Sequence, residues 1–400
     1  MTNKQLIDLQ NKYVAHNYKP LPVVLTRGHG VWVYDVEGKK YMDCLSAFSS
    51  VNQGHTNKKL AAVIKKQVTQ LTMTSRAFYS DQLALFAKEL CKLAGFEMML
   101  PMNSGAEAVE TAIKVVRKYG YVKKGIPKDK AEIIVAAGNF HGRTITVVGF
   151  STEETYKDGF GPFTPGFKVV PYNNVKAIEK AINKNTIAVL IEPIQIEGGI
   201  IVPDEGYLSK VAALCKKKKV FLMYDEIQTG LGRTGKLFAF QHEKDAKPDV
   251  LILGKALSAG CYPVSAVLAS KEIFSVIGPG SHGSTFSGNQ LASAIARTAL
   301  KILVEEKLSQ NSAKLGAYFM QKVKTIKSPL IKDIRGRGLV VGIELTKESG
   351  GARKYCEQLA KEGILCKETH DMVIRMAPPL IITKKEIDYA FAKLKKVLEV

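Results

Sequence analysis

The chain has 400 residues, of which 46% are hydrophobic and 24% are charged, and this composition excludes a disordered or fibrous protein. Its length corresponds to two domains, or to one large domain with additions. The formal net charge of +21 fits a nucleic-acid-binding surface or a lysine-rich surface that keeps a protein soluble.

Other features of the sequence indicate where the protein is located in the cell and what it binds. No apolar run approaches the roughly 18 residues that a membrane span needs, and the chain starts with neither an apolar signal core nor an Arg-rich leader. We therefore expect a cytoplasmic protein that does not enter membranes. The six cysteines lack CxxC spacing, so we expect reduced thiols and no metal site. Because the basic residues are spread along the chain, with one block at Lys216–Lys219 that ends a predicted helix, we expect no nucleic-acid binding.

Two kinds of predicted element occupy the first 290 residues. Residues 21–45 are predicted to form strands, with a turn at Glu37-Gly38. Further along the chain, short apolar runs alternate with amphipathic helical patterns, which is typical of a parallel sheet covered by helices on both faces. These runs are 131–137, 167–172, 187–193, 220–226 and 249–254.

The last 110 residues mix helical patterns with strands around 339–345 and 372–380. We predict an α/β fold with a large central domain of mostly parallel sheet, residues 56–290. A smaller α+β domain would be built from both chain ends, residues 1–55 and 291–400. Ligands of open α/β sheets bind beyond the carboxyl ends of the strands, so functional residues are expected directly after the apolar runs.

Lys255 and Asp225 both follow apolar runs of this kind. Burial lowers the pKa of a lysine and frees its amine as a nucleophile for Schiff-base chemistry. The 30 residues from Asp225 to Lys255 fit one helix between two strands, which would place both groups at one sheet edge. Pyridoxal phosphate (PLP) requires such a lysine, and a carboxylate that keeps its pyridine nitrogen protonated. The alternatives are a lysine that extends to solvent at a strand end, a carboxylate that caps a helix, and Glu226 as the competing carboxylate.

A phosphate group would need hydrogen-bond donors. The segment Asn103–Ala106 opens a predicted helix that looks uncapped, and the free amide groups of such a helix start bind phosphate. The alternative is an ordinary helix cap by Asn103 or Ser104. A second candidate is the Gly/Ser/Thr loop at 280–289, with Thr285 near its centre, although alone it indicates only a loop.

Taken together, these motifs resemble the class III PLP-dependent aminotransferases, which have the fold type I architecture, and the resemblance covers nearly the whole chain. Further segments resemble the ornithine aminotransferases within that class. The class motifs are NSGAEAVETA (103–112), NFHGRT (139–144), EPIQ (192–195), DEIQTGLGRTG (225–235), LGKALSAG (253–260), GSTFSGN (283–289) and RGRGL (335–339). The ornithine-type segments are 16–24, 46–55, 75–79 and 374–380.

The resemblance implies a role for each residue of a cofactor site. Lys255 would bind PLP through an imine and then carry a proton between substrate and cofactor. Asp225 would pair with the pyridine nitrogen, Gln228 would bond the phenolic oxygen, and Phe140 would stack on the ring. The remaining implied contacts are to the phosphate, from the amide groups of Gly105 and Ala106 and from Thr285 of the other subunit, so a homodimer with active sites at its interface is expected.

The resemblance also implies how substrates bind. Arg143 would bind the α-carboxylate of ornithine and later a carboxylate of 2-oxoglutarate, and Arg375 would bind the second carboxylate of 2-oxoglutarate. Glu197 would pair with Arg375 and mask it while ornithine, which has one carboxylate, is bound. Tyr18 would contact the α-amino group of ornithine. The implied reaction moves the δ-amino group of L-ornithine to 2-oxoglutarate and gives glutamate-5-semialdehyde and glutamate.

Two positions near the substrate depart from the pattern of the ornithine enzymes. Phe48 stands where they usually have Tyr, so a hydroxyl beside the substrate is lost. Ile196 stands where they usually have Gly, and a β-branched residue disfavours positive φ beside Glu197. Another ω-aminotransferase, acting on N-acetylornithine or 4-aminobutyrate, is therefore an alternative, and so is a catalytically silent binding protein with the same fold.

Overall fold

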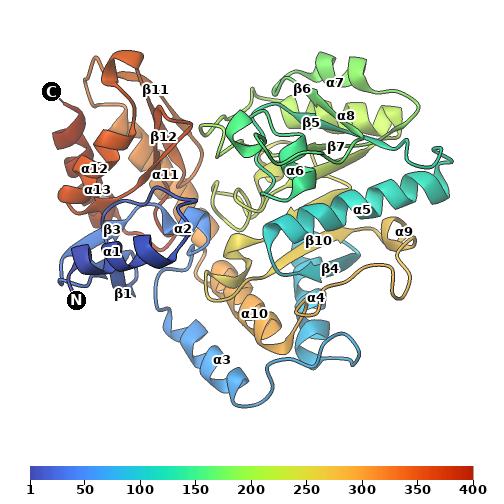
Figure 1. Cartoon of the computed structure of the whole chain (residues 1–400), viewed down its shortest axis with the longest axis horizontal. Helices are drawn as coiled ribbons and strands as arrows, with labels where there is room; N and C mark the ends of the chain where they lie inside the picture. The colour runs from blue at the N-terminus through green and yellow to red at the C-terminus, as the bar shows by residue number, and fades with distance from the viewer. Residues whose placement is uncertain (400) are drawn as a thin grey trace.

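The computed structural model describes residues 1–399; Val400, the last residue of the predicted C-terminal domain, lies outside the described residues. The elements from the two chain ends gather on one side of the molecule, and those from the middle of the chain lie on the other (Figure 1). Three sheets form the framework, one of seven strands and two of four strands. The predicted combination of a large sheet domain and a smaller part built from both chain ends is confirmed.

The seven-stranded sheet has the order β4-β10-β9-β8-β7-β5-β6. Its strands β9, β8, β7, β5 and β6 pair in parallel, whereas β10 runs antiparallel to β9 and β4. Each of the five predicted apolar runs coincides with one of the parallel strands, and only β7 begins one residue before its run. The strands are β4 (Met98–Met102), β5 (Glu132–Ala136), β6 (Phe167–Val170), β7 (Thr186–Ile191), β8 (Phe221–Asp225), β9 (Val250–Leu253) and β10 (Ser265–Ala269).

Both faces of the inner parallel strands are buried, which explains the continuous apolar runs. Successive side chains of a strand point to opposite faces. In β7, Ala188 and Leu190 join the core that includes α5 (Gly105–Lys123), whereas Val189 and Ile191 join the core that includes α7 (Val175–Ala181) and α8 (Tyr207–Lys218). The layers therefore hold the strand ends of the sheet in fixed positions.

One of the two smaller sheets joins the N-terminal and C-terminal parts of the chain. It has the order β1-β2-β3-β13, and its parallel pairing of β3 with β13 adds a C-terminal strand to the N-terminal sheet. The other has the order β11-β12-β15-β14 and is wholly C-terminal. The domain boundaries at residues 55 and 290 stay a prediction. These strands are β1 (Leu25–His29), β2 (Trp32–Asp35), β3 (Lys40–Asp43), β11 (Ile331–Gly336), β12 (Val341–Leu345), β13 (Ile364–Leu365), β14 (Lys367–Thr369) and β15 (Val373–Met376).

Arg233 ties the central part of the chain to both ends. Its side chain is fully buried, and its Nη1 donates to the carbonyl oxygens of Leu339 and Pro378 at 2.7 and 2.6 Å. Its Nη2 donates to Oδ1 of Asn52 at 2.5 Å. A guanidinium with these fixed acceptors holds three chain segments together.

The remaining helices cover the sheets and the chain ends. Helix α10 packs on α3 and α4 at the lower part of the view in Figure 1. Among the described residues, none of the helices is both long and apolar enough to span a membrane. Besides α5, α7 and α8, the helices are α1 (Asn3–Tyr13), α2 (Ser46–Ser49), α3 (Lys58–Val68), α4 (Asp81–Ala94), α6 (Ile145–Gly149), α9 (Lys271–Phe274), α10 (Gln290–Glu305), α11 (Leu308–Val323), α12 (Arg353–Lys361) and α13 (Lys384–Leu398).

Candidate active site

The carboxyl ends of β8 and β9 bring Asp225 and Lys255 to one cavity. The two strands are parallel neighbours, with Asp225 opposite Ile252, so the residues that follow them meet at one sheet edge. The cavity has a volume of about 200 Å³. Six of the predicted site residues line it, namely Gly105, Ala106, Phe140, Asp225, Gln228 and Lys255. The other lining residues are His141, Gly142, Glu192, Ile227 and Thr229.

Lys255 has the properties of an amine nucleophile. Burial lowers its pKa to about 8, although the nearby carboxylate of Glu197 opposes this change. A substantial fraction of the amine is therefore neutral near pH 8 and able to attack a carbonyl carbon. Lys255 also has a φ of 43°, in the left-handed region that residues with a side chain rarely adopt. Such strained conformations concentrate at functional sites.

The carboxylate of Asp225 is buried and held by two donors. Nδ1 of His141 lies 2.7 Å from its Oδ2 and donates a hydrogen bond, and the amide of Ile227 donates to Oδ1 at 3.0 Å. The histidine ring is fully buried, and its Nε2 has no hydrogen-bond partner among the described residues. Sequence reasoning assigned no role to His141, although the residue lies inside the motif NFHGRT.

Glu192 is a second residue that sequence reasoning missed, although it opens the motif EPIQ. It is almost fully buried, and its Oε2 accepts a hydrogen bond from the amide of Phe140 at 3.0 Å. Burial, reinforced by the negative charge of Asp225, raises the pKa of Glu192 well above its ordinary value. Its surroundings therefore favour the neutral carboxyl form of Glu192, whose hydrogen bond fixes the backbone that carries Phe140.

The start of α5 is capped, contrary to its uncapped appearance in the sequence. The hydroxyl of Ser104 accepts a hydrogen bond from the amide of Glu107 at 3.2 Å, and the Glu107 carboxylate accepts one from the amide of Ser104 at 2.6 Å. This capping box leaves the amide groups of the first two helical residues, Gly105 and Ala106, without an intrahelical acceptor. Close packing surrounds them, since a Cβ atom on Gly142 would lie 2.8 Å from Cβ of Ala106.

Glu197 and Arg375 form an ion pair next to the cavity, with Oε1 and Nη1 separated by 2.5 Å. The same oxygen accepts a hydrogen bond from Nε2 of Gln228 at 3.1 Å, which links the pair to the cavity lining. The guanidinium of Arg375 lies 4.8 Å from the centre of the Phe48 ring. Burial alone would raise the pKa of Glu197, but the attraction of Arg375 and Lys255 lowers it below its ordinary value.

Three predicted site residues lie outside this cluster. The guanidinium of Arg143 is exposed and lies 3.8 Å from the centre of the Tyr156 ring and 5.5 Å from that of Phe140. Tyr18 is 70% exposed, and Thr285 is also exposed. Neither Tyr18 nor Thr285 lines the cavity in the single chain.

Ile196 does not strain the backbone beside Glu197. Its φ is not among the positive values of the described residues. Its side chain is 1% exposed and packs in a small core with Ile200, Val340 and Ala377. The concern that a β-branched residue would prevent Glu197 from pairing is therefore not supported, because the pair with Arg375 is formed.

Comparison with known proteins assigns the family. The family model described as Aminotransferase class-III matches residues 13–398. The chain therefore belongs to the class-III aminotransferases. It is 54% identical over 395 residues to an ornithine aminotransferase from Brevibacillus brevis, covering 99% of this chain and 98% of that protein.

Solved structures of this aminotransferase class are similar along the whole chain. The ornithine aminotransferase of Toxoplasma gondii superposes with a TM-score of 0.97 at 42% identity, covering 100% of this chain and 95% of that one. The acetylornithine aminotransferase of Elizabethkingia anophelis superposes with a TM-score of 0.90 at 45% identity, covering 100% and 99%.

Class-III aminotransferases depend on PLP, and the residues of this cavity fit that cofactor. Lys255 supplies an amine of lowered pKa, Asp225 a buried carboxylate, and Phe140 an aromatic ring. Oε1 of Gln228 is buried without a partner among the described residues, as expected of an atom that awaits a ligand. Among residues 1–399, no group of three or more His, Cys, Asp or Glu side chains is arranged to hold a metal ion.

Proposed function

We propose that this aminotransferase transfers the δ-amino group of L-ornithine to 2-oxoglutarate, giving glutamate-5-semialdehyde and glutamate. The observation that carries the proposal is the ion pair between Glu197 and Arg375. Ornithine has one carboxylate, so an unmasked Arg375 would attract the wrong end of it. 2-Oxoglutarate has two carboxylates and can use Arg375 once Glu197 moves away. One site can thereby accept two unlike substrates.

The residues of the cavity divide the chemical work. PLP, when bound, draws electrons from the substrate carbon that carries the amino group. We propose that Nζ of Lys255 would accept the proton of that carbon and deliver it on the cofactor side, which its pKa of about 8 permits near neutral pH. Asp225 would hold a proton on the pyridine nitrogen. Phe140, positioned by Glu192, would fix the plane of the ring.

Substrate carboxylates are assigned to the two arginines. We propose that Arg143 binds the α-carboxylate of ornithine, because a guanidinium binds a carboxylate through two parallel hydrogen bonds. The exposure of Arg143 leaves it accessible. Tyr18 would contact the α-amino group, so that the δ-amino group faces Lys255.

We also assign the protein to the cytoplasm, since all six cysteines are free thiols, the state that a reducing compartment maintains.

We propose that the enzyme acts as a homodimer. Phe78, Tyr79 and Phe286 are 70%, 106% and 53% exposed, and large aromatic side chains are unusual in such numbers on a free surface. Thr285, which lies next to Phe286, would reach the phosphate site of the other subunit. The exposure of Thr285 in the single chain is consistent with this assignment.

The decisive experiment compares amino donors with purified, PLP-loaded protein. Ornithine, N-acetylornithine and 4-aminobutyrate are each supplied with 2-oxoglutarate, and kcat/KM is measured for each. We expect ornithine to give the largest value. N-acetylornithine is the main rival, because an acetylornithine aminotransferase is 45% identical to this chain. A larger value for either rival donor would refute the assignment of ornithine.

A catalytically silent protein is tested with the same material. Bound PLP that has reacted with Lys255 absorbs visible light, and Lys255→Ala removes that absorbance. A colourless wild-type protein after incubation with PLP would support the binding protein instead.

A further inference from the structure

The segment that carries Glu197 is a closed loop. It follows β7, and its two ends are joined by an isolated antiparallel bridge between Gln195 and Ile201. Their amide and carbonyl groups exchange hydrogen bonds of 3.1 and 2.9 Å. Inside the loop, Gly199 and Ile200 both have positive φ, 108° and 58°. Glu197 therefore stands on a short, strongly bent segment whose position must be fixed from outside.

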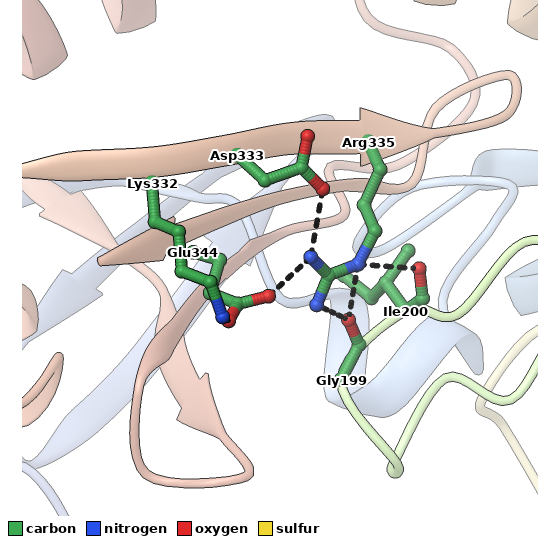
Figure 2. Close-up of polar contacts among 6 residues, drawn as sticks. All are labelled: Gly199, Ile200, Lys332, Asp333, Arg335 and Glu344. Carbon is green, nitrogen blue, oxygen red and sulfur yellow. Dashed lines mark hydrogen bonds and ion pairs between the residues drawn. The ribbon is translucent and has the colours of Figure 1, made fainter. Parts of the chain in front are cut away.

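Arg335, on β11, holds this loop by its backbone (Figure 2). Its Nη2 and Nε both donate to the carbonyl oxygen of Gly199, at 2.7 and 3.0 Å, and its Nε also donates to that of Ile200 at 3.2 Å. Hydrogen bonds from a charged donor are stronger than neutral ones. The guanidinium thus binds the carbonyl groups of the loop two and three residues after Glu197.

Two carboxylates hold Arg335 in place. Its Nη1 donates to Oδ2 of Asp333 at 2.9 Å and to Oε2 of Glu344, as Figure 2 shows. The other oxygen of Glu344 accepts from Nζ of Lys332 at 2.6 Å. The side chains of Arg335 and Glu344 are only 18% and 20% exposed, so water weakens this arrangement less than it weakens a surface ion pair.

The loop crosses the whole C-terminal sheet, whose edge strands are β11 and β14. At the β14 edge, the hydroxyl of Thr369 donates to the carbonyl oxygen of Glu197 at 2.7 Å. On β12, between them, Gly342 leaves room for Ile200, because a Cβ atom there would lie 3.1 Å from Cδ1 of Ile200. Arg375, on β15, pairs with Glu197 itself. The backbone of the loop is thus fixed at both edges of the sheet that presents Arg375.

We propose that Arg335 is a positioning residue for the Glu197–Arg375 pair and thereby sets the preference of the site between one-carboxylate and two-carboxylate substrates. This inference rests on the proposed function, in which Glu197 masks Arg375 for ornithine and uncovers it for 2-oxoglutarate. Arg335 touches no substrate and acts only through the backbone of Gly199 and Ile200.

The direction of the effect follows from the populations of two states. In the masked state Glu197 pairs with Arg375, and in the unmasked state Arg375 is free to bind a carboxylate. A clamped backbone reduces the conformational entropy that Glu197 loses when it pairs. Removing the clamp shifts the population toward the unmasked state. A ligand that binds only that state then gains apparent affinity in proportion to its population.

The test uses the PLP-loaded enzyme and glutarate, an unreactive dicarboxylate of the same length as 2-oxoglutarate. We expect Arg335→Gln to bind glutarate about three- to tenfold more tightly than the wild type, measured by calorimetry. We expect kcat/KM of the ornithine half-reaction, followed by the absorbance of the cofactor in single turnovers, to fall by a similar factor. Lys332→Gln is the matched control, since it removes a charge from the same cluster without touching the loop, and it should leave both values within twofold.

A second variant and a double mutant separate the clamp from a general loss of structure. Thr369→Val removes the hydrogen bond to Glu197 at the opposite edge of the sheet and should change both values in the same direction. In a Glu197→Gln background, Arg335→Gln should no longer tighten glutarate, because no mask remains to be released. If Arg335→Gln leaves the affinity for glutarate unchanged or weakens it, or tightens it equally without Glu197, the clamp is refuted.

The two proposals fail in distinguishable ways. A wild-type enzyme that does not use ornithine, but whose glutarate affinity responds to Arg335→Gln as described, refutes the choice of ornithine and retains the clamp. A wild-type enzyme that uses ornithine, but whose Arg335→Gln variant does not bind glutarate more tightly, refutes the clamp and retains ornithine.

Discussion

Nδ1 of His141 lies 2.7 Å from Oδ2 of Asp225, and both side chains are buried. A buried carboxylate without hydrogen-bond donors would be costly. The hydrogen bond from His141, with that from the amide of Ile227, satisfies the carboxylate and fixes its orientation. The histidine therefore supports the residue that is proposed to hold a proton on the cofactor.

We expect His141→Phe to weaken PLP binding by about 10- to 100-fold, the cost of removing one donor from a buried charged acceptor. The affinity is measured by fluorescence titration of the apo-protein with PLP. His141→Asn, which retains a donor, should lose less. Equal affinity of the Phe variant and the wild type would show that Asp225 does not depend on this hydrogen bond.

In the apo-protein, Lys255 should lower the free energy of unfolding below pH 8. Burial lowers the pKa of Lys255 from 10.5 to about 8, so the unfolded chain binds more protons than the folded one between these two values. Lys255 therefore lowers the free energy of unfolding most below pH 8, by about 3 kcal/mol. This destabilisation shrinks to nothing as the pH rises toward 10.5. We expect Lys255→Met to be more stable than the wild type at pH 7, with a smaller difference at pH 10. Denaturant unfolding of both proteins at each pH measures this, and a pH-independent difference would contradict it.

Glu192 should tolerate replacement by its neutral isostere. The raised pKa of Glu192 favours its uncharged form, and Gln can still accept the hydrogen bond from the amide of Phe140. We expect Glu192→Gln to keep kcat within about threefold, whereas Glu192→Ala, which leaves that amide unpaired, should lose about 10-fold or more. Because the folded pKa is the higher one, the wild type loses stability as the pH rises above 4.5, and the Gln variant should not share that loss. Loss of activity in the Gln variant comparable to that in the Ala variant would show that the charged form is needed.

The inner parallel strands of the central sheet, β5, β7, β8 and β9, were predictable because they are buried on both faces. The run at 220–226 contains β8 and the run at 249–254 contains β9. Their parallel pairing then places Asp225 and Lys255 at one sheet edge. A local pattern sufficed here, because strand burial and the position of a residue at a strand end are local properties.

Other features depend on contacts between distant parts of the chain, which no local pattern reveals. His141 and Asp225 are 84 residues apart, and Arg335 and Gly199 are 136 residues apart. The cap of α5 was open to two interpretations, because the same residues, Asn103 and Ser104, suit a cap or an anion site. Thr285 is exposed in the single chain, and the phosphate site that it is proposed to reach lies in a second chain.

The proposed dimer can be tested at Tyr79, whose side chain is 106% exposed. If this residue is buried between two subunits, Tyr79→Glu places an unpaired charge in the interface, which should weaken association by about 30-fold or more. Light scattering after size-exclusion chromatography measures the mass, and activity should fall with it, because Thr285 would no longer reach its partner. Val122→Glu, at a 59% exposed position on α5, is the control and should stay dimeric and active. A Tyr79 variant that keeps the mass of the wild type across a dilution series would show that this aromatic surface is not the contact between subunits.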